Sequence, residues 1–340
     1  MQTLPFSFFS RRDILCGITA TVALAALKMP AIAADAPLRF ESDYGVAVLP
    51  KPAQRVVSLG YTTQDTLLAL EVVPLAIRDW YGDQPSGVWP WAQPYLKDAH
   101  PRLIKGAVGL ELIACLKPDL IVAISSGITE AEYAGLSRIA PVLMQPKGVS
   151  TYGLPWDEMT LLIGRAVGKN RLAAELIART RQTIATVRQR HPDWAGRTAT
   201  AAYHEGGETG LFAPSDTRGH FLAELGFQLP PAAMGLIGPG GFYQKLSPED
   251  LAVLEADLLL WVSASEDAGD LRKLPMRLLL KSHTEGREVF AGATVAAAIS
   301  FGSVLSLPFA VTSLEADIAA ALDGDPKTPV PGAVRAGIAP

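Results

Sequence analysis

Residues 111–124 read ELIACLKPDLIVAI, and residues 249–262 read EDLAVLEADLLLWV. Both stretches place a glutamate five residues before a leucine and eight residues before an aspartate, and both then continue with five apolar residues. The first part of each stretch is typical of a short helix. The apolar run lacks polar alternation, which is typical of a buried parallel strand. This repeat predicts the same helix-to-strand unit in each of two lobes of like construction.

Alternating strand and helix patterns fill most of the remaining chain. We expect strands at 55–59, 75–77, 142–144 and 198–203, and helices at 64–71, 130–139, 156–167 and 219–225. Strands that alternate with helices imply parallel sheets covered by helices. The predicted fold class is therefore α/β, with a mostly parallel sheet flanked by helices in each lobe.

One long helix is predicted between the lobes. Apolar residues recur at helical spacing from Asn170 to about Arg190, and His191-Pro192 stops the pattern. We therefore expect an N-terminal lobe at 34–168, a spine helix at 169–192 and a C-terminal lobe at 193–322. Residues 323–340 are rich in Pro and Gly, which predicts a flexible tail.

The first 33 residues have the order of an export signal. Arg11 and Arg12 follow Ser10, an apolar run extends to Leu27, and residues 31–33 form a small-x-small cleavage site. The apolar run falls short of the ~20 residues that a membrane span needs. This pattern predicts a cleaved signal peptide at 1–33, recognition by the twin-arginine translocase, and a mature protein in the periplasm.

Composition and charge exclude several classes of protein. The chain has 340 residues, of which 49% are hydrophobic, and a net charge of -4. Such an apolar chain is not intrinsically disordered, and its acidic balance excludes a chain-wide basic field for nucleic acid. Cys115 is the one cysteine outside the predicted leader, and its apolar surroundings predict a buried side chain. The five histidines form no close pair, so we expect no metal held by the protein. We also expect no resident cofactor and a monomer.

Three tryptophans, Trp80, Trp89 and Trp91, lie within twelve residues among Pro and Gly. This setting predicts a loop, and exposed aromatic residues on loops tend to be functional. Arg78, Trp80 and Tyr81 directly follow the predicted strand 75–77, and the carboxyl ends of parallel strands are where α/β lobes present ligands. We rank these three first as ligand contacts. Trp89 and Trp91 either face the ligand or pin a long loop to the core.

Further candidate ligand contacts share a position at a strand end or in a flexible loop. They are Tyr61 after the first strand, Tyr203 with His204 at the end of strand 198–203, Arg218, and Phe242 and Tyr243 in a glycine-rich loop.

The sequence resembles the periplasmic substrate-binding proteins for ferric siderophores and cobalamin, the helical-spine class of ABC importer receptors. The resemblance covers about residues 50–322. It rests on RVVSL at 55–59, the block around LKPDLI at 116–121, the spine helix and LSPEDL at 246–251. The motif FGSVLSLP at 301–308 is similar to the ferric-siderophore branch. The resemblance implies a receptor that captures a ferric siderophore and delivers it to an ABC-type inner-membrane importer.

The resemblance also implies roles for single residues. One exposed glutamate on each lobe of these receptors docks on arginines of the permease, and Glu111 and Glu249 match the two positions. Both glutamates are predicted in the first turn of a helix, where the helix dipole alone would favour a carboxylate. Because the chelator already fills the iron shell, the candidate ligand contacts would supply aromatic faces and cations rather than metal ligands.

Several alternatives stay open. An aromatic cleft also suits cobalamin or haem. A zinc or manganese receptor would need a cluster of His, Asp or Glu ligands, which the histidine spacing does not favour. An exported enzyme is disfavoured because no Gly-x-Ser-x-Gly elbow or His-Glu-x-x-His motif is found, and Asp79 and Asp83 are ordinary turn formers. The resemblance implies that a ferric-hydroxamate receptor would carry an arginine in its first lobe, but the segment 106–110 has none, which weighs against a hydroxamate siderophore. Arg78 and Arg218 would equally serve a catecholate or carboxylate chelate.

Overall fold

Five short parallel strands form the sheet of the N-terminal lobe, in the order β5-β4-β3-β6-β7. They are β3 (Val56–Ser58), β4 (Ala76–Arg78), β5 (Arg102–Ile104), β6 (Leu120–Val122) and β7 (Val142–Leu143). Helices α1 (Thr63–Ala69), α2 (Leu110–Leu116) and α3 (Glu130–Ser137) alternate with them. All residues of β3 and β6 are buried, which explains why their sequences run apolar without alternation. A hairpin of β1 (Leu38–Ser42) and β2 (Gly45–Leu49) precedes this sheet.

The C-terminal lobe has a mixed sheet in the order β10-β9-β8-β11-β12. Its strands are β8 (Ala199–Glu205), β9 (Glu208–Phe212), β10 (Tyr243–Leu246), β11 (Leu258–Val262) and β12 (Glu288–Ala291). Strands β8, β11 and β12 are parallel, whereas β9 and β10 are antiparallel to their neighbours. The helices of this lobe are α6 (Thr217–Glu224), α7 (Pro231–Met234), α8 (Gly269–Arg272), α9 (Lys281–Thr284), α10 (Ala293–Phe301), α11 (Ser306–Ala321) and α12 (Pro331–Ala336).

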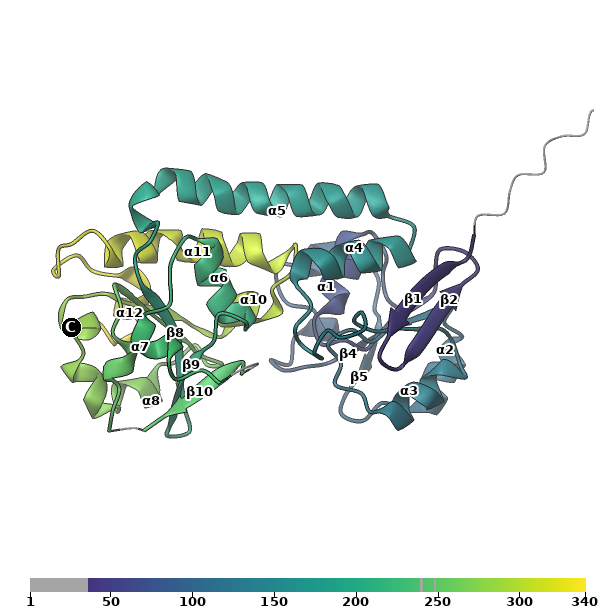
Figure 1. Cartoon of the computed structure of the whole chain (residues 1–340), viewed down its shortest axis with the longest axis horizontal. Coiled ribbons are helices and arrows are strands. Elements are labelled where there is room, and N and C mark those ends of the chain that lie inside the picture. Colours follow the sequence, from purple (N-terminus) through teal and green to yellow (C-terminus); the bar gives the residue numbers. More distant parts are fainter. Residues whose placement is uncertain (1–35, 239–240, 248) are drawn as a thin grey trace, which may run out of the picture. The chain divides into compact units, whose positions relative to one another are not determined.

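The spine helix α5 spans Asn170–Arg190, as the sequence predicts. It packs against α4 (Trp156–Ala166) at one end and against α11 of the C-terminal lobe toward the other (Figure 1). Its buried side chains, among them Leu176, Ile184 and Val187, recur at helical spacing. The predicted α/β fold, with two lobes and one long connecting helix, is confirmed. The boundaries at 34–168 and 193–322 stay a proposal.

The computed structural model describes residues 36–238, 241–247 and 249–340. The predicted signal peptide at 1–33 lies outside these residues. Within them, no helix is both long enough and apolar enough to cross a lipid bilayer.

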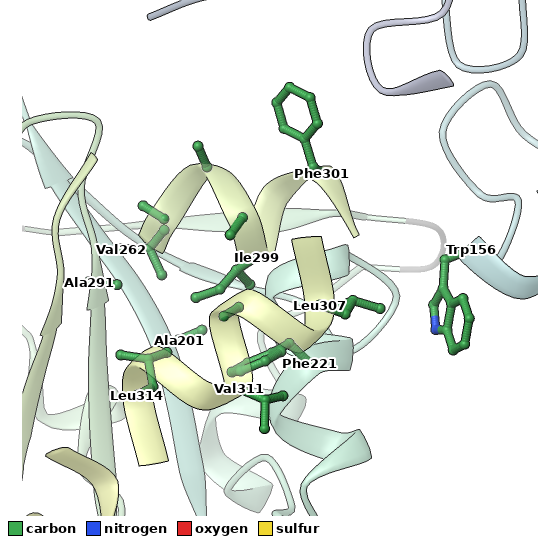
Figure 2. Packing of buried hydrophobic residues seen from close by; sticks show 14 of the residues in the cluster. Trp156, Ala201, Phe221, Val262, Ala291, Ile299, Phe301, Leu307, Val311 and Leu314 are labelled. Atoms are coloured by element: carbon green, nitrogen blue, oxygen red, sulfur yellow. The ribbon is translucent and has the colours of Figure 1, made fainter. Parts of the chain in front are cut away.

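A single apolar layer fills the space between the second sheet and its helices. Ala201, Val262 and Ala291 of the strands meet side chains of α6, α10 and α11 (Figure 2). Phe301, at the end of α10, points away from the other labelled side chains in this view, yet it is only 3% exposed. Its ring is therefore buried against a different part of the molecule, which proves to be the N-terminal lobe.

The two repeated stretches lie in separate sheets, and their aspartates make equivalent contacts. The Asp119 carboxylate precedes β6 and accepts hydrogen bonds from the backbone N–H groups of Gln54 and Arg55, just before β3. The Asp257 carboxylate precedes β11 and accepts the backbone N–H of Thr198, just before β8. Each aspartate therefore ties the start of its own strand to the start of the neighbouring parallel strand.

The second repeat departs from the prediction in its helix. Glu111 lies in the first turn of α2, as expected, but Glu249 is not helical. Only a 3-10 turn at Ala252–Leu254 is present. The reason is local: the Ser247 hydroxyl accepts the N–H of Glu249, and the Asp250 carboxylate accepts the N–H of Ala252. Such side-chain bonds compete with helix formation.

Two further expectations are wrong. Cys115 is exposed rather than buried, because α2 buries Ile113 and a residue two positions later points to the opposite face of a helix. Residues 323–340 do not form a loose tail. They carry α12, and Ala333 and Ile338 are buried in the core of the C-terminal lobe. The Asp317 carboxylate accepts the backbone N–H of Gly332 and holds the start of this helix.

Candidate ligand-binding site

Four of the candidate residues lie together where β3 and β4 end. The guanidinium carbon of Arg78 lies 4.6 Å from the centre of the Tyr61 ring. The Trp80 ring lies 5.7 Å from Tyr61 and 4.7 Å from Tyr81, edge to face with the latter. Trp80 is 42% exposed, so it presents part of its ring to solvent. This cluster offers flat aromatic surface beside a cation.

Arg78 is held in place but keeps its charge unpaired. Its Nη1 donates to the carbonyl oxygen of Ser126, 2.8 Å away, just beyond β6. Its Nε is buried and has no hydrogen-bond partner among the described residues. We find no ion pair to Arg78 in the part of the chain that the structure describes. A fixed, half-buried guanidinium with free donors is suited to a planar anionic group such as a carboxylate.

The C-terminal lobe contributes a second polar and aromatic group. Arg218 forms two hydrogen bonds with the Asp216 carboxylate, at 2.6 and 2.7 Å, and stacks 3.8 Å from the Phe212 ring. The charge of Arg218 is therefore already matched, unlike that of Arg78. The Tyr203 hydroxyl donates to Glu208 over 2.8 Å, and burial together with this carboxylate raises the pKa of Tyr203, so its phenol stays protonated.

Two contacts join candidate residues of the two lobes. Burial raises the pKa of Tyr81 to about 12, while Ser300 of α10 and the charge of Arg218, both from the C-terminal lobe, lower it in part. The Phe242 ring lies 6.4 Å from the ring of Tyr152, which is 50% exposed and belongs to the N-terminal lobe. The structure therefore brings candidate residues of both lobes into one region.

Tyr243 lies beside this region. It is 51% exposed, and its ring centre lies 6.2 Å from that of Tyr203. It thus offers a second accessible aromatic face, on the C-terminal lobe.

Trp89 and Trp91 do not face solvent, which favours the alternative that they pin the loop to the core; the ligand contact of Trp89 stays a prediction. They are 3% and 8% exposed, and their rings stack at 5.5 Å. Phe301 of the C-terminal lobe packs 5.5 Å from Trp91 and 6.2 Å from Trp89. A Cβ on Gly82, whose φ is +89°, would lie 2.5 Å from the Trp89 ring. These two tryptophans pin the loop, and Trp89 lies 5.5 Å from the ring of the half-buried Tyr81.

A pocket of about 270 Å³ at the carboxyl ends of β8 and β11 was missed by the sequence reasoning. Trp261 and Phe290 lie among its lining residues. Its polar lining is mostly acidic and hydroxyl side chains with two basic ones, and consists of Glu205, Ser263, Ser265, Asp267, Asp270, His204 and Lys273. Burial lowers the pKa of His204, whose Nδ1 lies 2.7 Å from the Thr209 hydroxyl. The signal that predicted Arg78, a position just past a parallel strand, would also have pointed to Ser263.

The two candidate docking glutamates lie apart from these groups. Glu111 and Glu249 are exposed, one in each lobe. Their carboxylates form no ion pair or hydrogen bond with any residue that the structure describes. In the same described residues, no group of three or more His, Cys, Asp and Glu side chains is arranged to hold a metal ion.

Comparison with known proteins identifies the family. Residues 56–277 match the family model described as periplasmic binding protein. The chain is 32% identical over 226 residues to the Fe(3+) dicitrate-binding periplasmic protein FecB of Escherichia coli K12, covering 65% of this chain and 70% of that protein. It is 28% identical over 216 residues to the ferric enterobactin-binding periplasmic protein FepB of Escherichia coli O6:H1, covering 60% of this chain and 65% of that protein.

Solved structures agree with this assignment. A periplasmic solute binding protein from Mycobacterium smegmatis is 34% identical, with a TM-score of 0.75 over 85% of this chain and 99% of that one. PiaA from Streptococcus pneumoniae, solved in complex with ferrichrome, has a TM-score of 0.70 over 84% of this chain and 99% of that one. Because the two sequences are only 22% identical, this match shows a shared fold alone. With two thirds of its sequence matched by the family model, the chain belongs to the periplasmic binding proteins, a family of binding proteins rather than enzymes.

Proposed function

We propose that this protein captures a ferric siderophore in the periplasm and delivers it to an ABC-type importer for iron uptake. The observation that carries the proposal is the cluster of Tyr61, Arg78 and Trp80, in which exposed aromatic surface adjoins an unpaired guanidinium. The relatives support it, since two of them are named for binding ferric dicitrate and ferric enterobactin. Fluorescence titration of the protein with these two chelates is the direct test.

The charge pattern favours an anionic chelate. Arg218 is already matched by Asp216, which leaves Arg78 as the cation of the site that is free to meet a ligand carboxylate or catecholate oxygen. Aromatic faces of Tyr61, Trp80 and Tyr243 would cover the organic part of the chelate. Cobalamin and haem, the alternative ligands of this fold, would use the same aromatic faces, and the propionate carboxylates of haem would also meet Arg78.

The test uses the emission of Trp80, which is 42% exposed and adjoins the proposed contacts. We expect ferric citrate or ferric enterobactin to quench tryptophan emission in a saturable way. Ferrichrome, cyanocobalamin and haemin serve as competing ligands of other classes. If neither anionic chelate quenches emission while cyanocobalamin or haemin does, the siderophore assignment is wrong. If none of the five changes emission or melting temperature, the proposed site is wrong as well.

Glu111 and Glu249 are proposed to dock on the permease of the importer. Support comes from their exposure in separate lobes and from carboxylates that no described residue engages. Two separated negative charges would orient the receptor on a basic partner and speed its encounter with it. Export through the twin-arginine translocase, proposed from Arg11 and Arg12, and a monomeric state stay predictions.

A further inference from the structure

A buried carboxyl group lies where the two lobes meet. Asp65 of α1 is 0% exposed. Its Oδ2 accepts a hydrogen bond from the indole Nε1 of Trp91 at 2.6 Å and another from the hydroxyl of Ser303 at 2.8 Å. Trp91 belongs to the N-terminal lobe, whereas Ser303 lies in the turn between α10 and α11 of the C-terminal lobe. One oxygen atom therefore links the two lobes.

The polar atoms around this link are buried but incompletely paired. Oδ1 of Asp65, Oε1 of Gln64 and Oγ1 of Thr66 are buried and have no hydrogen-bond partner among the described residues. All three belong to consecutive positions of α1. A buried polar atom without a partner costs free energy that contact with water would recover. This stretch of α1 is therefore poised to admit water.

Charged groups nearby are engaged elsewhere. Helix α1 packs against α4, where Asp157 pairs with Arg181 and Arg165 lies over the Phe40 ring. Glu158, the remaining charged residue of α4, is itself acidic and so supplies no positive charge to Asp65, and α10 has no charged side chain. Because no cation faces it, burial raises the pKa of Asp65 to about 7, and the bonds from Trp91 and Ser303 offset this only in part.

A second polar contact between the lobes lies at the first residue of α4. The Trp156 indole donates to Oε1 of Glu224 on α6 at 2.9 Å, and His220 lies 3.6 Å from the same carboxylate. Glu224 raises the pKa of His220, so this contact keeps its ion pair when pH falls. The contact of Glu224 with Trp156 and His220 therefore serves as the control for the effect of Asp65.

We propose that Asp65 is a latch between the lobes, and that separation of the lobes at Ser303 accompanies loss of the Asp65 proton. The neutral carboxyl tolerates its dry position and keeps the bond from Ser303. The ionised carboxylate is stabilised by water, which reaches it only when Ser303 moves away. The hydroxyl of Thr180 on the spine donates to the carbonyl of Val304, beside the latch, so the spine limits the movement to a small rocking of the lobes.

The test measures the distance between the lobes without any ligand. Cys115 is an exposed natural cysteine on the N-terminal lobe, and Lys281 is exposed on the C-terminal lobe. The full chain carrying Cys16→Ser and Lys281→Cys is labelled with a donor and an acceptor dye. We expect energy transfer to change between pH 5.5 and pH 8.5 with a midpoint near 7, and Asp65→Asn to abolish this change. A pH-independent signal in the parent chain, or the same midpoint in Asp65→Asn, overturns the proposal.

Two further variants keep the test decisive even if Asp65→Asn folds poorly. Ser303→Ala removes the bond across the lobes, so its energy transfer at pH 5.5 is expected to match that of the parent chain at pH 8.5. A value equal to the parent chain at pH 5.5 contradicts the latch. His220→Gln changes the other titrating contact and is expected to keep the parent midpoint. Loss of the midpoint in His220→Gln would assign the movement to Glu224 instead.

Discussion

The guanidinium carbon of Arg78 lies 4.6 Å from the centre of the Tyr61 ring, and Nη1 of the same group donates to the carbonyl of Ser126. A cation fixed in this way has little side-chain entropy left to lose when a ligand arrives. Arg78 is the last residue of β4, so the sheet itself sets the direction of the charge.

Replacing Arg78 tests the contribution of this charge. We expect Arg78→Gln to weaken binding of ferric citrate or ferric enterobactin by about tenfold or more, because a hydrogen bond to a charged group is worth roughly 1.5–3 kcal/mol. Fluorescence titration measures the change. Arg138→Gln, an exposed arginine at the end of α3, is the matched control and is expected to bind like the parent protein. Equal affinities in the two variants would show that Arg78 does not contact the chelate.

Docking is tested by separating uptake from binding. The double variant Glu111→Ala with Glu249→Ala is expected to abolish uptake of the ferric chelate in cells while binding in vitro stays unchanged. The control, Glu130→Ala with Glu285→Ala, removes one exposed carboxylate from each lobe and is expected to leave uptake intact. Normal uptake in the first variant, or loss of uptake in both, would contradict a specific docking role.

Asp65 also predicts a pH dependence of stability. The pKa of its carboxyl rises from 3.8 to about 7 on folding, so between these values the folded protein holds one more proton than the unfolded chain. The contribution of Asp65 to the free energy of unfolding therefore falls as pH rises from about 4 to 7, on the order of 1 kcal/mol for each pH unit, and is constant above that.

Urea denaturation of the parent chain and of Asp65→Asn at pH 4, 5.5, 7 and 8.5 isolates this effect. The asparagine variant keeps the shape of the side chain but does not titrate. Its stability relative to the parent chain is expected to improve steadily with pH up to about 7. A difference that does not vary with pH would mean that folding does not change the pKa of Asp65.

A buried ion pair in the C-terminal lobe gives a stability prediction far from the ligand site. Arg277 and Glu288 are 3% and 2% exposed, and Nη1 lies 2.5 Å from Oε2. The same Nη1 donates to the carbonyl of Ile338 near the end of the chain. Glu288→Ala leaves the guanidinium buried without its partner, so we expect a loss of about 3–5 kcal/mol in thermal or urea denaturation. Glu285→Ala, on the surface nearby, is expected to change stability by less than about 1 kcal/mol.

The sequence predicts well those parts of the fold that follow from a periodic pattern of neighbouring residues. The spine from Asn170 to Arg190 is right because its apolar period needs no knowledge of its partners. Tyr61, Arg78 and Trp80 are brought together as expected, since all follow parallel strands whose ends share one edge.

Other features depend on partners far away in the chain, which a local pattern does not reveal. Trp89 is buried because Phe301 arrives from the other lobe, more than two hundred residues later. In the sequence, Asp65 looks like an ordinary polar residue of a helix, because nothing near it in the chain indicates its hydrogen bond with Ser303. The C-terminal residues looked like a tail because nothing local shows that Arg277 holds the carbonyl of Ile338.

Phe301 has a consequence for how the molecule is built. Its ring completes the aromatic packing of Trp89 and Trp91, although it is carried by the opposite half of the polypeptide. Neither half is therefore autonomous: expressed alone, one would leave a hollow beside two indoles and the other would display a bare phenyl group. Grafting a half from a relative would succeed only if both sides of this contact were transplanted together.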